Sequence, residues 1–301
     1  MQRRHIVLLA VAVTAVSTSA VLIRAADNLG VPALAIAFYR CALASVVLLP
    51  LLWAGHRDEI RGLSRASRWL LLGSGLALGC HFATWVSSLS YTSIAASSVL
   101  VQTMPIWVAL AGPLIGEHTS RRGWVGIMIA LVGTGVIAGA SSGGSLTNPV
   151  LGDALAIAGA IFAAIYVLIG RKVRQELSLV GYAGSVYAIA AAALGLAMLA
   201  SGTPFVGFPA EAWLLFAAMT AGPQFLGHTV FNHLLGEMKA SVVSVALLAE
   251  PVGATLLGVL VYQERPGAQV VAGAIVVLVG VAITVLAESS SRPEVLASGE
   301  G

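Results

Sequence analysis

The sequence predicts an all-α integral membrane protein with ten transmembrane helices, arranged as two inverted five-helix repeats. Three observations lead to this fold class: an apolar composition, an uneven distribution of basic residues and an internal repeat. The chain of 301 residues is 58% hydrophobic and only 10% charged, whereas soluble domains are about 25% charged. Such a chain cannot cover a water-exposed surface, so its main solvent is predicted to be lipid.

Ten apolar runs have about the length that a bilayer core requires. They lie near 6–24, 33–53, 70–90, 96–115, 123–140, 151–169, 180–200, 212–235, 241–262 and 268–287. Backbone groups cannot stay unpaired in hydrocarbon, so long runs without strand alternation predict helices. The first run follows Arg3 and Arg4, an arrangement that also occurs in signal peptides. However, this run is nearly long enough to span a membrane, and many similar runs follow it, which favours a first transmembrane helix over a cleaved signal.

The distribution of basic residues supports both the number of spans and their orientation. With the N-terminus in the cytoplasm and the sides alternating, most of the 16 Lys and Arg residues fall in inner loops. Only Arg24 and Arg265 fall outside, and Arg40 lies within the second span. Inner loops of membrane proteins carry this excess of positive charge. We therefore expect an inner-membrane protein with both termini in the cytoplasm.

The chain also contains an internal repeat at a spacing of 146 to 147 residues. Ser98, Pro105 and Gly112 match Ser244, Pro251 and Gly258, and Glu117, Gly126 and Gly133 match Glu264, Gly273 and Gly280. Five helices per unit is an odd number, so the second unit enters the membrane from the opposite side. The predicted units are 6–140 and 151–287, followed by a disordered cytoplasmic tail over 288–301.

Three segments resemble a known family. They are AFYRCALA at 37–44, SLSYTSIAASSVLVQTMPIWVALAGPLIGE at 88–117 and GHTVFNHLLGEMKASVVSVALLAEPVGATLLGVLVYQE at 227–264. The chain is similar to the EamA type of the drug/metabolite transporter superfamily over nearly its whole length. This resemblance implies a central cavity lined mainly by helices 1, 3, 4, 6, 8 and 9, and transport by alternating access. Family members include exporters of amino acids and related metabolites.

Two histidines occupy equivalent positions in the two repeats. His81 shares a helix face with Trp85, and His228 shares one with Gln224 and Asn232, because residues at i and i+4 align on an α-helix. Two such faces related by pseudo-symmetry predict a substrate site near the midplane, where an imidazole can carry a proton. The alternative is that both histidines only pack helices together.

Two charged residues lie well inside predicted spans. Glu250 precedes Pro251 and is a candidate for substrate binding or proton coupling, because a buried carboxyl is costly unless it has a use. The alternative is a structural role, in which the Glu250 side chain hydrogen-bonds a backbone group that Pro251 leaves without a helical partner. Arg40 could hold an anionic group of the substrate, or form a structural ion pair with Glu250.

Further candidates for substrate binding are Gln102, Trp107 and Tyr166, which offer polar and aromatic contacts. Pro105 and Pro251 are predicted to kink their helices in matching positions, which points to the transport site. The paired glycines Gly126–Gly133 and Gly273–Gly280 predict close helix packing.

The sequence predicts a secondary transporter, most simply an exporter of a small metabolite such as an amino acid. Alternatives are proton-coupled multidrug efflux, a membrane-embedded enzyme and a passive channel. No nucleotide-binding, zinc or nucleophile motif stands in a credible context, so neither an enzyme nor a cofactor nor a metal is expected. The expected partners are a small molecule, the lipid bilayer and, as a candidate coupling ion, the proton, with no nucleic acid. A monomer and a homodimer both remain open.

Overall fold

The computed structural model describes residues 2–91, 97, 100–140, 148–250, 252–253, 257 and 267–290, and every regular element within them is helical. In chain order, these elements are α1 (Arg3–Ser17), α2 (Ser19–Asn28), α3 (Ala33–Leu51), the π-helix η1 (Leu52–His56), α4 (Arg57–Gly62), α5 (Arg65–Ser88), α7 (Met104–Ala111), the 3-10 helix η2 (Gly112–Ile115), α8 (Arg121–Ala140), α9 (Pro149–Val173), α10 (Leu179–Ser201), α11 (Ala210–Met219), the π-helix η3 (Thr220–Thr229), α12 (Val230–Glu237), α13 (Ala240–Ala246), the 3-10 helix η4 (Leu247–Ala249) and α15 (Ala268–Ser290). The disordered tail is predicted to begin at residue 288, but α15 continues through Ser290, and Glu288 bonds Ser120 and Lys239. The rest of the predicted tail, 291–301, lies outside the described residues.

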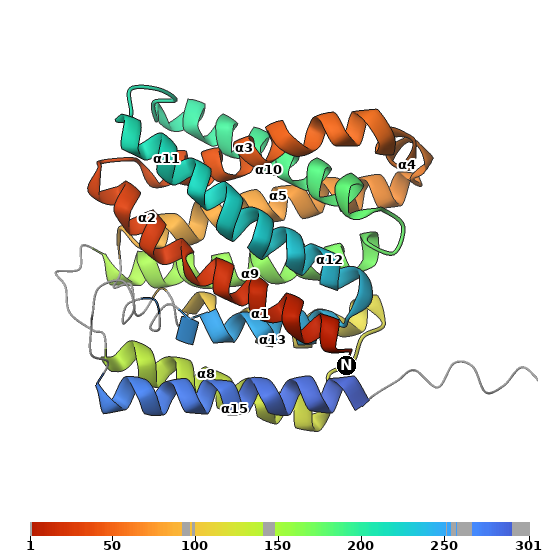
Figure 1. The fold of residues 1–301 in the computed structure, drawn as a ribbon, viewed down its shortest axis with the longest axis vertical. Coiled ribbons are helices and arrows are strands. Elements are labelled where there is room, and N and C mark those ends of the chain that lie inside the picture. Colours follow the sequence, from red (N-terminus) through yellow and green to blue (C-terminus); the bar gives the residue numbers. More distant parts are fainter. Residues whose placement is uncertain are drawn as a thin grey trace, which may run out of the picture.

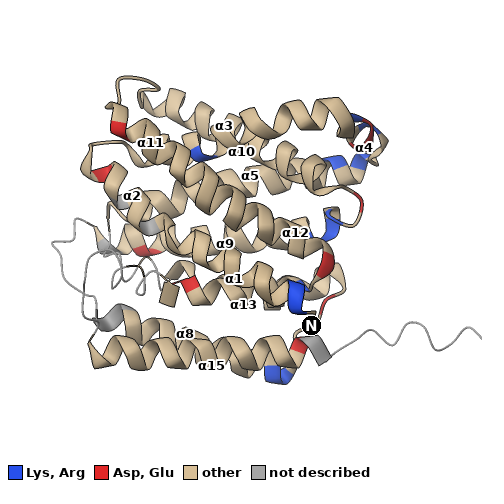
Figure 2. Cartoon of the chain, in the orientation of Figure 1, with Lys and Arg blue, Asp and Glu red and all other residues tan. Residues whose placement is uncertain are grey.

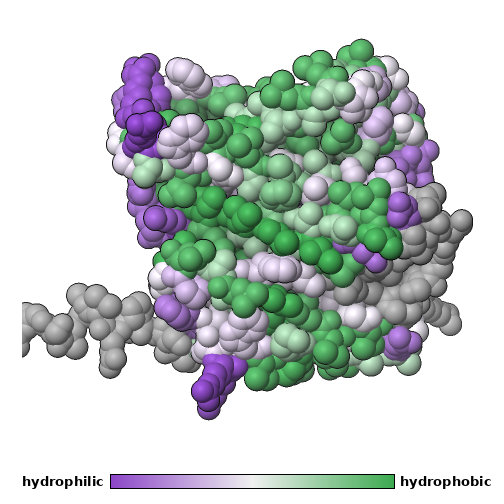
Figure 3. Space-filling model, turned by 180° about the vertical axis from the view of Figure 1, so that it is seen from behind, coloured by the Kyte–Doolittle hydropathy of each residue, from purple (hydrophilic) through white to green (hydrophobic). Residues whose placement is uncertain are grey.

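Much of the described surface is apolar, as lipid contact requires. Six helical stretches of the described chain are long and apolar enough to cross a membrane: Arg3–Asn28, Ala33–Gly62, Arg65–Ser88, Val150–Val173, Leu179–Ser201 and Ala268–Glu288. Large apolar side chains stay exposed on them, among them Val46 at 68% and Leu196 at 66%. Figure 3 shows mostly apolar side chains across the middle of one face, with hydrophilic ones gathered towards its two ends.

The helices lie side by side in one bundle, with α8 and α15 paired along one side and α3 and α10 near the opposite side (Figure 1). Between them lie α1, α9, α12 and α13. The chain begins, and α15 ends, at the end of the bundle where α4 lies. Most Lys and Arg residues drawn in Figure 2 gather at this end, which we call the basic end.

Several long helices are interrupted rather than regular. The first span is divided at Thr18 into α1 and α2, and the second continues past Pro50 through η1 and α4 to Gly62, beyond its predicted end at 53. The π-helix η3 contains Pro223. A proline has no N–H and removes one helical hydrogen bond, and the π-helices η1 and η3 follow or contain a proline.

The helix that contains Pro105 is interrupted just before the proline rather than bent at it. The helix breaks at a turn over Gln102 and Thr103 and starts again at Met104, so Pro105 lies in the first turn of α7. A first-turn proline loses no hydrogen bond. In the other repeat, the equivalent positions fall in η4, directly before Glu250. Pro251 lies outside the described residues.

The paired glycines place α8 against α15. A Cβ added to Gly126 would lie 2.7 Å from the carbonyl oxygen of Gly280, and one on Gly133 would lie 2.8 Å from that of Gly273. The repeat equates Gly126 with Gly273 and Gly133 with Gly280. Each contact is therefore the symmetry mate of the other, and the two helices run antiparallel, as expected for helices related by a pseudo-two-fold axis. Small residues allow this close backbone approach.

Candidate functional site

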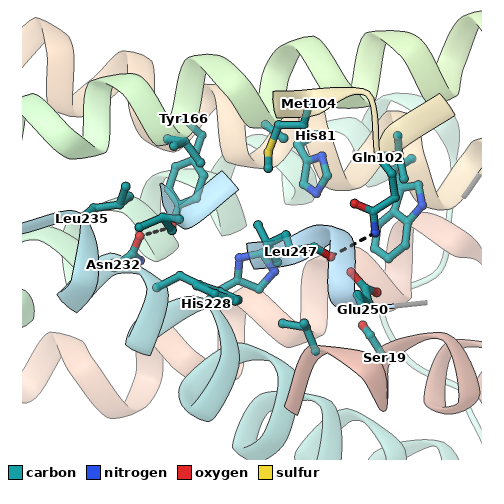
Figure 4. A pocket seen from close by; sticks show the side chains of 17 residues that line it. Ser19, His81, Gln102, Met104, Tyr166, His228, Asn232, Leu235, Leu247 and Glu250 are labelled. Atoms are coloured by element: carbon teal, nitrogen blue, oxygen red, sulfur yellow. Dashed lines mark hydrogen bonds between the residues drawn. The ribbon is translucent and has the colours of Figure 1, made fainter. Parts of the chain in front are cut away.

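A pocket of about 70 Å³ lies at the centre of the bundle, between α1, α5, α9, η3, α12 and α13. Figure 4 shows Asn232 and Leu235 at one end of it and Gln102, Glu250 and Ser19 at the other, with His81 and His228 between them. Seven of the nine residues predicted to bind substrate line this pocket: His81, Trp85, Gln102, Tyr166, His228, Asn232 and Glu250. The other two, Trp107 and Gln224, do not.

The lining follows the internal repeat. Residues 147 positions apart form the pairs Val16–Ala163, Ser19–Tyr166, His81–His228 and Trp85–Asn232, and residues 146 positions apart form Val101–Leu247 and Met104–Glu250. Both members of every pair line the pocket. The pocket therefore lies across the pseudo-two-fold relation between the two halves of the chain. The pairs also differ in chemistry, since the second half supplies a phenol, an amide and a carboxyl where the first has Ser19, Trp85 and Met104.

His81 is fixed on α5 by a hydrogen bond to the backbone of α9. Its Nδ1 lies 2.9 Å from the carbonyl oxygen of Gly159. A carbonyl oxygen only accepts, so Nδ1 carries a proton and Nε2 is the acceptor of the neutral ring. The imidazole stacks on Trp85 with ring centroids 5.7 Å apart and 11° between the planes. The Trp85 Nε1 group is buried and has no hydrogen-bond partner among the described residues.

The ring of Phe82 contacts three side chains at or near the pocket: His81, His228 and Arg40. Its ring lies 5.0 Å from the His81 ring and edge-on to His228 at 5.3 Å. The Arg40 guanidinium carbon lies 4.1 Å from the centroid of the same ring, a cation–π contact. Arg40 is 1% exposed, so the aromatic face helps to hold a charge that is otherwise costly in this apolar setting.

The predicted ion pair between Arg40 and Glu250 is not formed. Arg40 instead donates from Nε to Gln224 Oε1 at 3.0 Å and from Nη1 to Ser19 Oγ at 3.4 Å. Its Nη2 and the Gln224 Nε2 are buried without hydrogen-bond partners in the described part of the chain. Among the described residues, Ser19 is the pocket-lining side chain to which Arg40 donates a hydrogen bond.

A polar network forms one end of the pocket. The Tyr166 hydroxyl donates to Asn232 Oδ1, and Asn232 Nδ2 donates to the Tyr187 hydroxyl at 3.3 Å. Tyr187 in turn bonds the Thr229 hydroxyl at 2.9 Å. This chain of donors and acceptors fixes the orientation of Asn232 and Tyr166, so both present defined polar atoms to the pocket.

Glu250 lies at the other end. Its side chain faces the pocket beside Gln102 (Figure 4). Its backbone oxygen accepts from Ser17 Oγ at 3.1 Å, which ties η4 to α1. Gln102 Nε2 lies 3.4 Å from the Leu247 carbonyl oxygen. The two interrupted helices, one from each half, therefore meet at this end of the pocket.

Trp107 is placed differently from the prediction. The break before α7 resets the helix, and the Trp107 indole bonds Thr103 Oγ1 at 3.2 Å and packs against the core. The prediction missed Phe82, Ser19 and Tyr187. The repeat spacing itself would have indicated the last two, because Tyr187 is the equivalent of Arg40 and Ser19 that of Tyr166.

Comparisons with known proteins agree with this architecture. The model of the EamA-like transporter family matches the chain twice, over residues 3–139 and 150–286. An uncharacterized transporter of Archaeoglobus fulgidus is 26% identical over 265 residues, which are 83% of this chain and 86% of that protein. A solved structure described only as the crystal structure of a protein superposes with a TM-score of 0.80 at 20% identity, covering 96% of this chain and 99% of that one. That likeness concerns the fold alone, whereas the two family matches span nearly the whole sequence. The resemblance seen in the sequence is confirmed: the chain belongs to the EamA-like transporter family.

Proposed function

We propose that this protein exports a small polar metabolite, such as an amino acid, across the cytoplasmic membrane by alternating access. Its ten spans form two inverted units over 6–140 and 151–287, and the basic end faces the cytoplasm with both termini. One observation carries the proposal: the central pocket is lined by equivalent residues of both halves and bordered by two interrupted helices. Inverted-repeat transporters place their substrate sites in this way.

The lining suggests the chemistry of the solute. Polar groups lie at both ends of the pocket, with Asn232 and Tyr166 at one and Glu250 and Gln102 at the other. Trp85 and His81, which stack on each other, add flat aromatic surface to the pocket wall. A small solute with a polar group at each end of a short apolar body fits this arrangement, because each end meets fixed partners.

Uptake into inside-out vesicles tests the proposal, with a panel of amino acids and related metabolites and with or without a pH gradient. We expect saturable uptake of at least one panel member, accelerated counterflow and no uptake by vesicles without the protein. The variant Leu214→Ala, at a lipid-facing side chain that is 73% exposed, serves as the unaffected control. A flat response across the panel would overturn the proposal, and uptake that neither saturates nor shows counterflow would indicate a passive channel.

A second candidate function is proton-coupled efflux of cationic drugs. It is favoured by Glu250, the carboxyl on the pocket wall, because such a carboxyl can bind a cation and a proton in turn. Substitution of Glu250 separates this function from metabolite export, as argued below.

A further inference from the structure

Glu117 joins the two halves of the chain at the basic end. It follows η2 in the first half, and its two carboxylate oxygens accept from two different segments of the second half. Arg171 Nε, at the end of α9, donates to Glu117 Oε1 at 2.6 Å, and the backbone N–H of Ala240, at the start of α13, donates to Oε2 at 2.8 Å. Both side chains of the ion pair are largely buried, at 16% and 24% exposed, so solvent screens the pair less than a surface ion pair.

The backbone before Glu117 holds this carboxylate in place. Gly116 adopts a φ of +79°, the left-handed conformation that glycine tolerates best. The Gly116 N–H bonds the Pro113 carbonyl oxygen at 3.1 Å, and the Glu117 N–H bonds that of Gly112 at 3.0 Å. This pair of bonds is a Schellman motif, which ends η2 sharply. The motif turns the chain so that Glu117 reaches α9 and α13.

Arg171 and its neighbour Arg174 also hydrogen-bond the backbone of residues that line the pocket. Arg171 Nη1 donates to the carbonyl oxygen of Leu235 at 3.0 Å, and Arg174 Nε donates to that of Asn232 at 3.0 Å. Leu235 and Asn232 both line the pocket. The Leu235 carbonyl lies in the last turn of α12, where helix carbonyls lack intrahelical partners and cations bind favourably, and the Asn232 carbonyl lies one turn earlier. Hydrogen bonds from Arg171 and Arg174 therefore connect the ion pair to the end of the pocket formed by Leu235 and Asn232.

We propose that Glu117 and Arg171 form a latch that closes the pocket towards the basic end. In the latched state, one carboxylate holds α9 and α13 of the second half against the end of η2 in the first half. Solute entering from this side must pass between these segments, so the latch has to open before the pocket can load. The inference rests on the proposed alternating access, since only a protein with two accessible states needs such a device.

Labelling of a single cysteine in the pocket tests the latch without any transported solute. The reporter is Met104→Cys, on the pocket wall, in a background in which Cys41 and Cys80 are replaced by alanine. A membrane-impermeant thiol reagent is added to inside-out or to right-side-out vesicles, and the rate of labelling is measured from each side. Because no solute is needed, failure of the latch is separate from failure of the transport proposal.

We expect Glu117→Gln to raise the rate of labelling from the basic end about tenfold and to lower it from the opposite side. Arg171→Lys keeps the charge but loses the fork that bonds Glu117 and Leu235 together, so its effect should be smaller. Asp58→Asn is the matched control, because this substitution makes the same chemical change at the same end of the bundle. Asp58 pairs within α4, with Arg61 at 3.5 Å and Arg57 at 3.9 Å.

Gel filtration and the melting temperature of each variant establish that it is folded. If Glu117→Gln does not fold, Arg171→Gln takes its place in the same comparison. Equal labelling of a folded latch variant and Asp58→Asn from both sides would overturn the proposal, and so would a latch variant that is labelled faster from both sides. The second result would show a fold that is only loosened, because a merely structural ion pair has no preferred side.

Discussion

His81 and His228 line one pocket from opposite halves of the chain, and the ring of Phe82 touches both imidazoles. Their settings nevertheless differ. His81 is bonded to Gly159 and stacked on Trp85, whereas His228 meets the edge of Phe82. Equivalent positions in the two halves therefore have unequal freedom, and His81 is the more constrained of the pair.

This difference predicts how substitutions at His81 behave. His81→Phe keeps an aromatic ring but removes the side-chain hydrogen bond to the Gly159 carbonyl, which keeps only its helical donor within α9. The loss of this one bond should lower the free energy of unfolding by about 0.5–1.5 kcal/mol. His81→Asn retains an N–H donor close to the position of Nδ1 and should lose less. Denaturant unfolding in detergent micelles measures both. Equal losses for the two variants would show that the hydrogen bond to Gly159 is not the stabilising contact.

The contact of α8 with α15 predicts an unusual response to alanine. An added Cβ on Gly280 would lie 2.4 Å from the Ala130 backbone nitrogen, so Gly280→Ala should force the helices apart and cost about 1–3 kcal/mol. Gly135 lies in α8, the other helix of this pair, but a Cβ there meets nothing within 4 Å. Gly135→Ala should be neutral or slightly stabilising, because alanine favours the helix. The melting temperatures of the two variants make the comparison, and parallel shifts would contradict the close packing.

The charge at the end of the pocket gives a third prediction. Glu250→Gln preserves shape beside Gln102 but removes the carboxylate, so affinity for a solute with an ammonium group should fall about 10- to 100-fold. Neutral solutes should be little affected. Met104→Leu, at the equivalent position of the other half, is the control. Binding competition with charged and neutral panel members measures the effect. Unchanged transport of cationic solutes by Glu250→Gln would exclude the efflux function that depends on this carboxyl.

The fold class could be predicted from the sequence because it depends on features that do not require the positions of individual side chains. An apolar composition, span lengths and the glycine spacing each reflect contact with lipid or between backbones, and these do not depend on side-chain direction. The repeat spacing located His81 and His228 for the same reason, since equivalent positions in two halves lie at equivalent depths. The α8–α15 contact between Gly126 and Gly280 is a direct consequence of that spacing.

The misplaced residues lie where the helix type changes. Gln224 was expected on the face of His228 because i and i+4 align on an α-helix, but both lie in the π-helix η3, whose hydrogen bonds run from i to i+5. The altered winding turns Gln224 away from the pocket and towards Arg40. Trp107 follows the break at Gln102–Thr103, which resets the rotation of α7. Sequence periodicity assumes one winding throughout and cannot detect either change.

The contacts of Glu237 at the basic end predict how stability depends on pH. His5 Nε2 lies 2.8 Å from Glu237 Oε2, and Arg4 and His233 lie 3.4 and 3.3 Å from Oε1. The hydrogen bond from His5, together with these neighbouring charges, lowers the pKa of the Glu237 carboxyl below its ordinary value of 4.5. The ionised carboxylate therefore stabilises the docking of α1 on α12 at any pH above that value, and this contribution is lost as the pH falls through the lowered pKa.

We expect the melting temperature in detergent to fall in acid by a larger amount for the native protein than for Glu237→Gln. In free energy of unfolding, the contribution of the Glu237 carboxylate should stay below about 1 kcal/mol, because the carboxyl is partly exposed and solvent screens its contacts. Glu211→Gln, on the exposed first turn of α11, provides the control for removing a surface carboxyl. An acid profile of Glu237→Gln that matches the native profile would show that this carboxylate does not hold α1 in place. A profile that flattens only for Glu237→Gln would assign the acid sensitivity of the basic end to the contact between Glu237 and His5.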